Sequence, residues 1–308
     1  MTDPSRQQLL TDWPRLHGDL FRGARALVTG GAGFIGSHLA DALARLGASV
    51  VVLDNLAGGS RQNLSAIAPV EFVEGSILDP AVVARAMRGV RYVFHQAALG
   101  SVPASVERPR EFHDVNVTGT LNVLEVARVA KVQRVLFAAS SSAYGDSPTL
   151  PKSESMSAAP RSPYAATKLA GEALMGAYAA SYGLDTVSLR YFNIFGPRQN
   201  ANSAYAAVIA AFAKALLSGQ SPVIHGDGEQ SRDFTYVDNA VHANLLAARS
   251  QRPLNGVVLN VAVGERVTVN ELLREMAALL GRADLKPEHR PERAGDVKHS
   301  LADLTRAQ

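Results

Sequence analysis

A glycine-rich turn between an apolar segment and a helical one constrains this chain most. Residues 26–29 are Ala-Leu-Val-Thr, which is typical of a short buried strand, and residues 34–46 have the spacing of a helix. The turn at residues 30–36 is Gly-Gly-Ala-Gly-Phe-Ile-Gly. Glycine allows a tight turn and a close approach of the backbone to a phosphate, and the helix N-terminus stabilises the anion. The pattern predicts a unit that holds the diphosphate of a dinucleotide, with a purely structural turn as the alternative.

A carboxylate after the next apolar segment supports the dinucleotide interpretation. Residues 49–53 are largely apolar, and Asp54 follows them 18 residues after Gly36. A carboxylate at this place accepts hydrogen bonds from both ribose hydroxyls and repels a 2′-phosphate. The sequence therefore predicts NAD rather than NADP as the cofactor. A solvated aspartate beside a structural turn is the alternative.

Apolar segments alternate with helical segments from residue 25 onward. We expect strands over residues 26–29, 49–53, 70–73, 90–95, 134–139 and 186–191, and helices over residues 34–46, 80–87, 116–130, 162–182, 204–218, 238–249 and 270–280. Strands that are apolar along their whole length are buried on both faces, which is typical of a parallel sheet with crossover helices. The sequence therefore predicts an α/β fold, a Rossmann-type doubly wound parallel sheet with a smaller C-terminal substrate-binding lobe.

This pattern divides the chain into three expected regions. Residues 1–23 are polar and mixed, and we expect an arm or short helix outside the core. Residues 24–190 are expected to form the Rossmann domain with the cofactor site. Residues 191–308, which contain more loop-forming residues, are expected to form mainly the substrate-binding lobe.

Composition and charge argue against several classes of function. The 308 residues include no cysteine, which excludes disulfides, thiolate catalysis and zinc–cysteine sites. The net charge is +3 without a block of Lys or Arg, so nucleic-acid binding is not predicted. The histidines have no metal-binding spacing, so no metal site is predicted. No signal peptide or membrane-spanning segment is expected, and we predict a soluble, cytoplasmic protein.

A tyrosine and a lysine on one predicted helix are the first candidates for catalysis. Tyr164 and Lys168 are four residues apart in the helix at 162–182, so they lie on one face. An ammonium group near a phenol favours the phenolate and lowers the pKa of the phenol, which would make Tyr164 a general base. Taken alone, such a pair more often lies on a solvated helix surface.

Residues at the ends of two predicted strands supply further candidates. Ser140 and its two following serines lie after the fifth strand, where a hydroxyl could share a proton relay with Tyr164 or serve only in a turn. Residues 96–100 follow the fourth strand, and their small side chains leave room for a ribose and a nicotinamide. His95, just before them, is expected to be a core histidine.

Together these motifs resemble the extended short-chain dehydrogenase/reductases, specifically the nucleotide-sugar epimerases and dehydratases, from residue 25 to residue 308. The resemblance implies that Ser140, Tyr164 and Lys168 are catalytic. It implies NAD contacts from Gly30, Gly33, Phe34, Ile35, Gly36, Asp54, Asn55, Gly59, Ser76, Ile77, Gln96, Ala97, Ala98, Tyr164, Lys168 and Tyr191. Ser76 stands where the family often has an adenine-binding Asp, so that carboxylate is absent here.

The resemblance also implies a UDP-sugar substrate. Asn193 in Leu-Arg-Tyr-Phe-Asn, Arg232, and the Arg293–Asp296 stretch match the family's diphosphate and uridine contacts. The implied substrate-binding residues are Gly100, Ser101, Ser140, Ser141, Ser142, Asn193, Ala207, Val208, Arg232, Arg293, Asp296 and Ser300. Relatives dimerise through the two long helices at 116–130 and 162–182, which implies a homodimer.

Three serines narrow the implied reaction. Dehydratases carry an Asp–Glu pair where this chain has Ser141 and Ser142, which favours simple inversion at C4. Galactose epimerases that reject N-acetyl sugars carry a Tyr where this chain has Ser300. The sequence is thus similar to UDP-N-acetylglucosamine 4-epimerases of bacterial polysaccharide pathways, and it implies C4 epimerisation of UDP-GlcNAc/UDP-GalNAc or the uronic acid through a transient 4-keto sugar.

Two alternatives remain open for this implied function. The first is a UDP-glucose/UDP-galactose or UDP-uronic acid 4-epimerase, because a wide pocket does not exclude smaller sugars. The second is an NAD-binding scaffold without catalysis, which would not need Ser140, Tyr164 and Lys168 together. The chain also ends at Gln308, where relatives continue, which leaves open a truncated C-terminus or a naturally short form.

Overall fold

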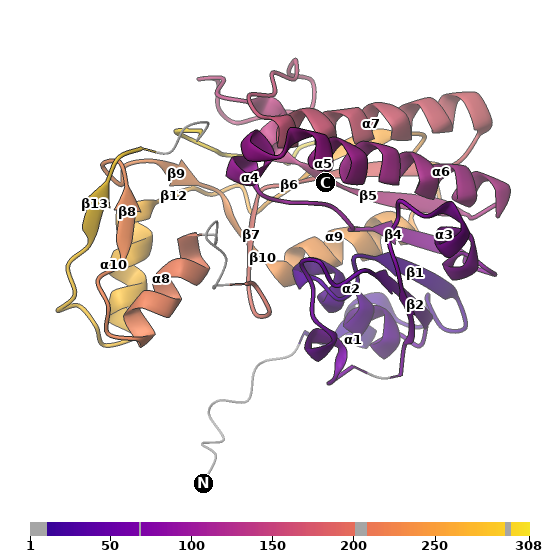
Figure 1. Cartoon of the computed structure of the whole chain (residues 1–308), viewed down its shortest axis with the longest axis horizontal. Coiled ribbons are helices and arrows are strands. Elements are labelled where there is room, and N and C mark those ends of the chain that lie inside the picture. The colour runs from indigo at the N-terminus through magenta and orange to yellow at the C-terminus, as the bar shows by residue number, and fades with distance from the viewer. Residues whose placement is uncertain (1–10, 68, 201–207, 293–296) are drawn as a thin grey trace, which may run out of the picture.

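The computed structural model describes residues 11–67, 69–200, 208–292 and 297–308, and its centre is a seven-stranded sheet (Figure 1). Neighbouring strands of this sheet all pair in parallel. Their order is β11-β6-β5-β4-β1-β2-β3. They are β1 Arg25–Thr29, β2 Ser49–Asp54, β3 Glu71–Glu74, β4 Tyr92–His95, β5 Arg134–Ser140, β6 Thr186–Tyr191 and β11 Val257–Val261. The predicted Rossmann-type α/β fold is confirmed, and the strand order reverses between β1 and β4.

Helices cover both faces of this sheet because its strands bury side chains on both sides. In β1, Ala26 and Val28 belong to one hydrophobic cluster, and Leu27 belongs to the other. The first cluster includes α2 and α9, and the second includes α3, α6 and α7. These helices are α2 Phe34–Arg45, α3 Pro80–Ala86, α6 Gly119–Val129, α7 Pro163–Tyr182 and α9 Val237–Arg249.

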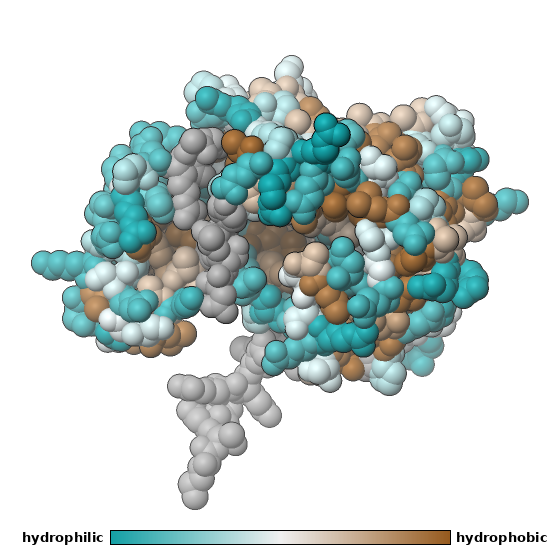
Figure 2. All heavy atoms as spheres, in the orientation of Figure 1, coloured by the Kyte–Doolittle hydropathy of each residue, from teal (hydrophilic) through white to brown (hydrophobic). Residues whose placement is uncertain are grey.

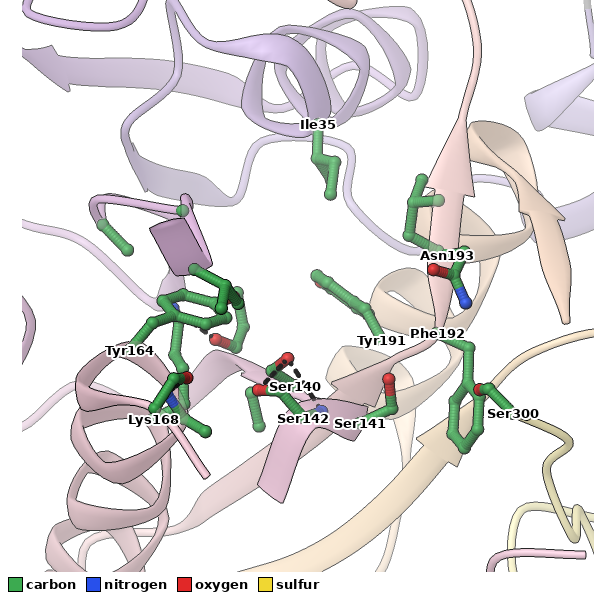
Figure 3. A pocket seen from close by; sticks show the side chains of 18 of the residues that line it. Ile35, Ser140, Ser141, Ser142, Tyr164, Lys168, Tyr191, Phe192, Asn193 and Ser300 are labelled. Carbon is green, nitrogen blue, oxygen red and sulfur yellow. Dashed lines mark hydrogen bonds between the residues drawn. The ribbon is translucent and has the colours of Figure 1, made fainter. Parts of the chain in front are cut away.

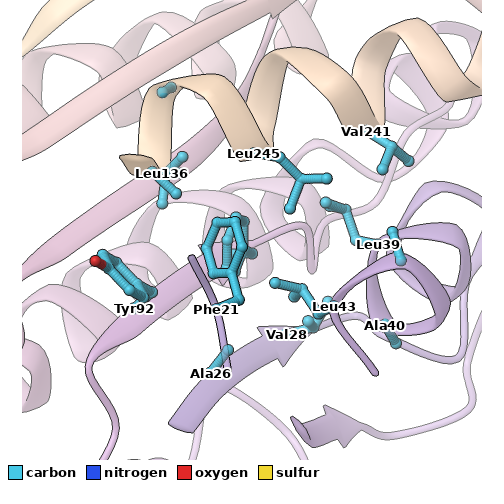
Figure 4. Close-up of a cluster of buried hydrophobic side chains, with 14 of the residues drawn as sticks. Phe21, Ala26, Val28, Leu39, Ala40, Leu43, Tyr92, Leu136, Val241 and Leu245 are labelled. Carbon is cyan, nitrogen blue, oxygen red and sulfur yellow. The ribbon is translucent and has the colours of Figure 1, made fainter. Parts of the chain in front are cut away.

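The described part of the N-terminal region belongs to the core, which differs from the expectation for residues 1–23. The short helix α1, Trp13–His17, buries Trp13 to 3% exposure, and Phe21 is fully buried. Phe21 lies between the sheet and the helices α2 and α9, close to Tyr92 and Leu245 (Figure 4). Its ring centroid is 5.8 Å from that of Tyr92. Sequence reasoning missed this packing because isolated aromatics in a polar segment show no periodicity.

The chain beyond β6 builds the smaller lobe and also returns to the large sheet. α8 and α10 pack on each other around a third hydrophobic cluster, away from the main sheet (Figure 1). β11 and α9 instead belong to the large sheet and its covering layer. The remaining elements of this part are β7 Asn193–Phe195, α8 Val208–Leu217, β8 Val223–His225, β9 Ser231–Arg232, β10 Phe234–Tyr236, β12 Val267–Thr268, α10 Val269–Leu279 and β13 Glu288–Arg290.

Several short helical elements were not predicted from the sequence. They are η2 Arg61–Leu64, α4 Val102–Glu107, α5 Pro109–His113, the π-helical turn η3 Asp114–Thr118 and the 3₁₀ turn η4 Ser141–Tyr144. They are too short to show a helical pattern, yet α4 and η4 follow β4 and β5 directly and shape the edge of the sheet. Among the described residues, none of the helices combines the length and apolarity needed to cross a membrane.

Candidate active site

A cleft of about 590 Å³ lies at the carboxyl ends of the parallel strands. The molecule is hollowed between the smaller lobe and the body of the sheet (Figure 2). The described lining of the cleft includes four basic side chains, Lys152, Arg161, Lys168 and Arg232, and no Asp or Glu. A cleft lined by charges of one sign attracts ligands of the other sign, so this one suits phosphate-bearing ligands.

Many of the predicted site residues line this cleft together. They are Gly33, Phe34, Ile35, Gly36, Gly59, Gln96, Ala98, Gly100, Ser140, Ser141, Ser142, Tyr164, Lys168, Tyr191, Asn193, Arg232 and Ser300. Tyr164 and Lys168 lie on one side, Asn193 and Ser300 on the other, and Ile35 projects from the start of α2 (Figure 3). The cleft therefore joins the predicted cofactor and substrate residues from both parts of the chain.

The glycine turn has the close packing that its sequence predicts. Gly30 has a φ of +68°, and a Cβ atom there would lie 2.7 Å from the Ala97 nitrogen. A Cβ atom at Gly36 would lie 2.2 Å from the Gly30 carbonyl oxygen, which only glycine avoids. Gly33 is the N-cap of α2 and has no side chain to cap the helix. The first N–H groups of α2 therefore face the cleft without helical partners and can bind an anion.

Asp54 lies where the sequence predicts, but its carboxylate also has a structural task. It accepts hydrogen bonds from the backbone N–H groups of Ala32, at 2.9 Å, and Leu56, at 2.7 Å. Its side chain is buried and does not line the cleft. Each carboxylate oxygen keeps a lone pair, so ribose binding by Asp54 remains a prediction alongside this brace of the turn.

Ser140, Tyr164 and Lys168 come together because β5 ends beside the start of α7. Ser162 caps α7 through a bond from the Ala165 N–H to its hydroxyl, which fixes the first turn. The Lys168 Nζ donates to the carbonyl oxygen of Ala138 in β5 at 2.8 Å and lies 6.0 Å from the centroid of the Tyr164 ring. The Ser140 hydroxyl is 2.8 Å from that of Ser142 (Figure 3).

Burial governs the protonation of Tyr164 and Lys168 in the chain by itself. It raises the pKa of the Tyr164 phenol, and a hydrogen bond with Ser140 opposes this shift. It lowers the pKa of the Lys168 ammonium to about 7, and the Glu172 carboxylate opposes this shift. The expectation that Lys168 holds the pKa of Tyr164 below its usual value is thus wrong for the chain alone. Desolvation of the phenolate is the larger cause, and it outweighs the opposing hydrogen bond with Ser140.

The other predicted site residues lie outside the lining of the cleft. Ser76 accepts a bond from the Leu78 N–H, Asn55 from the Ala57 N–H, and Ser101 caps α4. Outside the lining with them are Gly30, Ala97, Ile77 and Val208. Ala207, Arg293 and Asp296 are not among the described residues, so their predicted roles are untested.

A buried ion pair between β6 and α7 escaped the sequence analysis. The Arg190 Nε and Nη2 donate to the two carboxylate oxygens of Glu172 at 2.8 and 2.7 Å. Arg190 also lies 4.5 Å from the centroid of the Tyr144 ring. The signal was available, since Glu172 is one helical turn after Lys168 and Arg190 interrupts an apolar strand, where a charge needs a partner.

The fold and the cleft define a dinucleotide-binding enzyme with a serine, a tyrosine and a lysine at the carboxyl edge of a Rossmann-type sheet. The model of the NAD dependent epimerase/dehydratase family matches residues 26–262, and the chain belongs to this family. It is 40% identical over 289 residues to a UDP-glucose 4-epimerase of Mycolicibacterium smegmatis, covering 92% of this chain and 91% of that protein. This membership makes the chain an NAD-dependent enzyme.

Solved structures give the same assignment. A UDP-N-acetylglucosamine 4-epimerase from Methanobrevibacter ruminantium, in complex with UDP-N-acetylmuramic acid, is 42% identical with a TM-score of 0.88, covering 93% of this chain and 91% of that one. A UDP-glucose 4-epimerase of Thermus thermophilus, in complex with NAD, is 39% identical with a TM-score of 0.82, covering 92% and 91%. Enzymes with these names are isomerases that act on different sugars.

The residues of this chain fit NAD. The N-terminus of α2 and the cations of the cleft suit its diphosphate. The buried Nε2 of Gln96 has no hydrogen-bond partner among the described residues, although Gln96 lines the cleft. A buried donor without an acceptor is costly, so this amide is suited to an acceptor on a bound ligand.

Proposed function

We propose that this chain inverts C4 of a UDP-N-acetylhexosamine, UDP-GlcNAc/UDP-GalNAc or the corresponding uronic acid, through a transient 4-keto sugar. The observation that carries the proposal is the meeting of Ser140, Tyr164 and Lys168 on one wall of the cleft that the glycine turn enters. Family membership supplies NAD as the cofactor. The UDP-sugar 4-epimerases among the relatives support the reaction class.

The roles of the three side chains follow from their places. Tyr164 as phenolate takes the proton of the 4-hydroxyl, and the Ser140 hydroxyl binds the same oxygen and holds it in line. Lys168 is fixed by the Ala138 carbonyl and adds positive charge to this region of the cleft when it is protonated. Bound NAD supplies a hydride acceptor and donor in a positively charged ring, which favours the phenolate electrostatically. Inversion requires that the hydride return to the opposite face of C4 after the keto sugar has turned, and Tyr164 then gives the proton back to the C4 oxygen.

The lining of the cleft supports inversion over elimination. Water elimination from a sugar needs a general acid and a general base beyond the tyrosine. Ser141 and Ser142 stand next to Ser140, and the described lining contains no carboxylate. Hydroxyl groups of serine do not titrate near neutral pH and cannot replace such a pair.

The choice of sugar rests on the size of residue 300. Ser300 lines the cleft, and it lies opposite the serines of η4 with Phe192 nearby (Figure 3). A small side chain leaves space for a 2-acetamido group, which a tyrosine would fill. Asn193 and Arg232 are proposed to hold the UDP portion with Arg293 and Asp296. Tight binding of UDP allows the 4-keto sugar to rotate and present its other face without being released.

A direct substrate comparison tests this proposal. The purified enzyme is incubated with UDP-GlcNAc, UDP-glucose and UDP-GlcNAcA, and the products are separated by anion exchange. Conversion of an N-acetylated substrate at the highest kcat/KM supports it. Preference for UDP-glucose favours the UDP-glucose 4-epimerase alternative, which the Mycolicibacterium relative represents. No conversion of any UDP-sugar would favour the non-catalytic scaffold.

The Ser300→Tyr variant tests the pocket itself. It should lose turnover of UDP-GlcNAc by at least about tenfold, because overpacking displaces the acetamido group. Turnover of UDP-glucose should be retained, and Ser300→Ala serves as the control without added bulk. An unchanged ratio of the two activities in Ser300→Tyr contradicts the pocket argument.

We also propose that two copies of the chain associate through α6 and α7. Leu121 and Val129 on α6 and Tyr182 on α7 are 38%, 71% and 57% exposed. Exposed apolar side chains on neighbouring helices are suited to a helical interface. Light scattering after gel filtration tests this, and Val129→Glu should shift a dimer toward the monomer. A cytoplasmic location stays a prediction for cell fractionation to test.

A further inference from the structure

Three polar side chains form a hydrogen-bonded chain that ends at the cleft. The Asn244 Nδ2 in α9 donates to the Tyr191 hydroxyl at 2.6 Å. The Tyr191 hydroxyl at the end of β6 donates to the Gln96 Oε1 at 3.3 Å. Asn244 is fully buried and Tyr191 is 8% exposed. This series of hydrogen bonds thus runs from α9 through Tyr191 in the sheet to Gln96, the residue after β4.

The direction of each bond follows from a count of hydrogens. The Asn244 Nδ2 also donates to the carbonyl oxygen of Ala240 at 2.7 Å, so both of its hydrogens are used. The Tyr191 hydroxyl must then accept from Asn244 and give its own hydrogen to Gln96. Burial raises the pKa of Tyr191 to about 12, so this hydroxyl keeps its hydrogen at physiological pH. Gln96 therefore offers its oxygen to Tyr191 and leaves its NH₂ group as the free end.

The place of Gln96 in the sheet indicates which half of NAD it meets. Its backbone N–H donates to the Thr29 carbonyl at the end of β1, so it lies at the point where the strand order reverses. A dinucleotide crosses this point with its adenosine half toward the acidic residue of the second strand, here Asp54 on β2. β4 lies on the opposite side of β1. Gln96 accordingly faces the nicotinamide half.

The family resemblance already implies an NAD contact from Gln96; we propose that its amide donates a hydrogen bond to an oxygen of the nicotinamide ribose, and that Tyr191 and Asn244 are the residues that aim it. The buried Nε2 of Gln96 is without a partner among the described residues. NAD binding completes the chain of bonds. This inference requires a bound NAD, as family membership gives, and does not depend on the sugar proposed above.

Binding measurements test this without any turnover. The full chain, freed of nucleotide, is titrated calorimetrically with NAD⁺, ADP-ribose and ADP. Gln96→Met keeps the length of the side chain and removes the donor, so it should weaken NAD⁺ and ADP-ribose by about tenfold, the usual loss for one buried hydrogen bond. ADP lacks the nicotinamide ribose and should bind to this variant as it binds to the wild type. Gln96→Glu keeps the acceptor for Tyr191 and should also weaken NAD⁺.

The aiming role needs its own comparison. Tyr191→Phe frees the amide to rotate and should weaken NAD⁺ by about threefold, a part of the donor's effect. The double variant Gln96→Met/Tyr191→Phe should bind NAD⁺ no more weakly than Gln96→Met alone. The matched control is Gln230→Met, which makes the same substitution away from these hydrogen bonds. The Gln230 Nε2 donates to the backbone carbonyl of His225. Gln230→Met should leave NAD⁺ binding unchanged.

Three results would overturn the proposal. If both Gln96→Met and Gln96→Glu bind NAD⁺ with wild-type affinity, Gln96 is not the donor. An equal loss for ADP places the acceptor outside the nicotinamide ribose. If the losses of NAD⁺ affinity in the two single variants add up in the double variant, Tyr191 does not aim Gln96. Loss of epimerase activity on every sugar, with these NAD⁺ affinities as expected, would instead count against the proposed function alone.

Discussion

At the scale of single residues, burial rather than direct attraction sets the protonation of the proposed catalytic pair. Burial favours the neutral forms of both Tyr164 and Lys168, which are held on one face of α7. The phenolate required by the reaction therefore depends on positive charge brought by the cofactor and on the hydrogen bond with Ser140. We propose that this arrangement limits the phenolate to the loaded enzyme, where the substrate hydroxyl donates its hydrogen bond to Tyr164.

The Tyr164→Phe variant should lose most of the epimerase activity. Removal of a general base typically costs 10²–10⁴-fold in rate. The measurement is kcat on the best UDP-sugar, with NAD content determined in parallel. Tyr236→Phe is the control, because its side chain is 36% exposed and lies outside the lining of the cleft. Near-normal turnover in Tyr164→Phe would remove this residue from the chemistry.

The Glu172→Gln variant should be strongly destabilised. Glu172 and Arg190 are both nearly buried, at 6% and 5% exposure, and loss of one partner leaves a buried charge unpaired. Such a change typically costs about 3–5 kcal/mol in the free energy of unfolding. Urea unfolding measures it. The double change Glu172→Met/Arg190→Met should recover most of the loss, since a buried pair and well-packed apolar groups have similar net stability. A double variant as unstable as Glu172→Gln contradicts this.

At the scale of elements, the end of α9 is held by a side chain from β5. The Arg134 guanidinium donates to the carbonyls of Ala247, Ala248, Ser250 and Arg252, and it pairs with Asp185. The last carbonyls of a helix have no helical partners, so this arginine replaces a C-terminal cap. Its charge also suits the negative end of the helix. The clamp ties the helix that carries Asn244 to the strand that leads to Ser140.

Arg134→Met should therefore loosen α9 and lower stability. The variant leaves buried carbonyls and Asp185 without their donor, which we expect to cost about 3–5 kcal/mol. Hydrogen exchange should show faster opening at residues 245–252 before it shows faster opening of β1. Arg128→Met is the control, because Arg128 pairs with Glu125 on the exposed surface of α6 and such pairs contribute about 0–1 kcal/mol. Equal losses in the two variants would contradict the clamp.

Sequence patterns predicted the elements whose signals are local. β1 to β6 are short apolar runs, and the glycine turn marks the first strand–helix unit without reference to the rest of the chain. β11 was missed because Val257–Val261 follows a long stretch of loops and helices, and only its pairing with β6 defines it. The same limit applies to the site. Ser140 and Tyr164 could be brought together from strand ends, whereas the chain from Asn244 to Gln96 depends on three distant elements.

At the scale of the whole molecule, buried histidines couple stability to pH. His95 lies between the Thr29 and Thr120 hydroxyls, at 2.7 and 2.9 Å, and is 1% exposed. Burial lowers its pKa to about 3. In a second group, His17 of α1 and His242 of α9 share a hydrogen bond of 2.9 Å, and burial lowers the pKa of both histidines. A shared bond needs one neutral nitrogen as acceptor, so two protonated rings cannot keep it.

The unfolded chain protonates His95 and His17 near pH 6.5, whereas the folded chain does so only near pH 3 and pH 4, because burial lowers the pKa of each. Their contribution is thus complete above pH 6.5 and is lost as the pH falls toward 3. We expect the free energy of unfolding to decrease between pH 6.5 and 4 by about 1.4 kcal/mol per pH unit for His95 alone. In His95→Gln, which cannot titrate, urea unfolding over this range should show a slope smaller by that amount. His113→Gln, whose side chain is 61% exposed, is the control and should keep the wild-type slope. An equal slope in His95→Gln and the wild type would mean that the folded protein accepts this proton as readily as the unfolded chain, which a ring enclosed by two hydroxyls and the apolar core should not do.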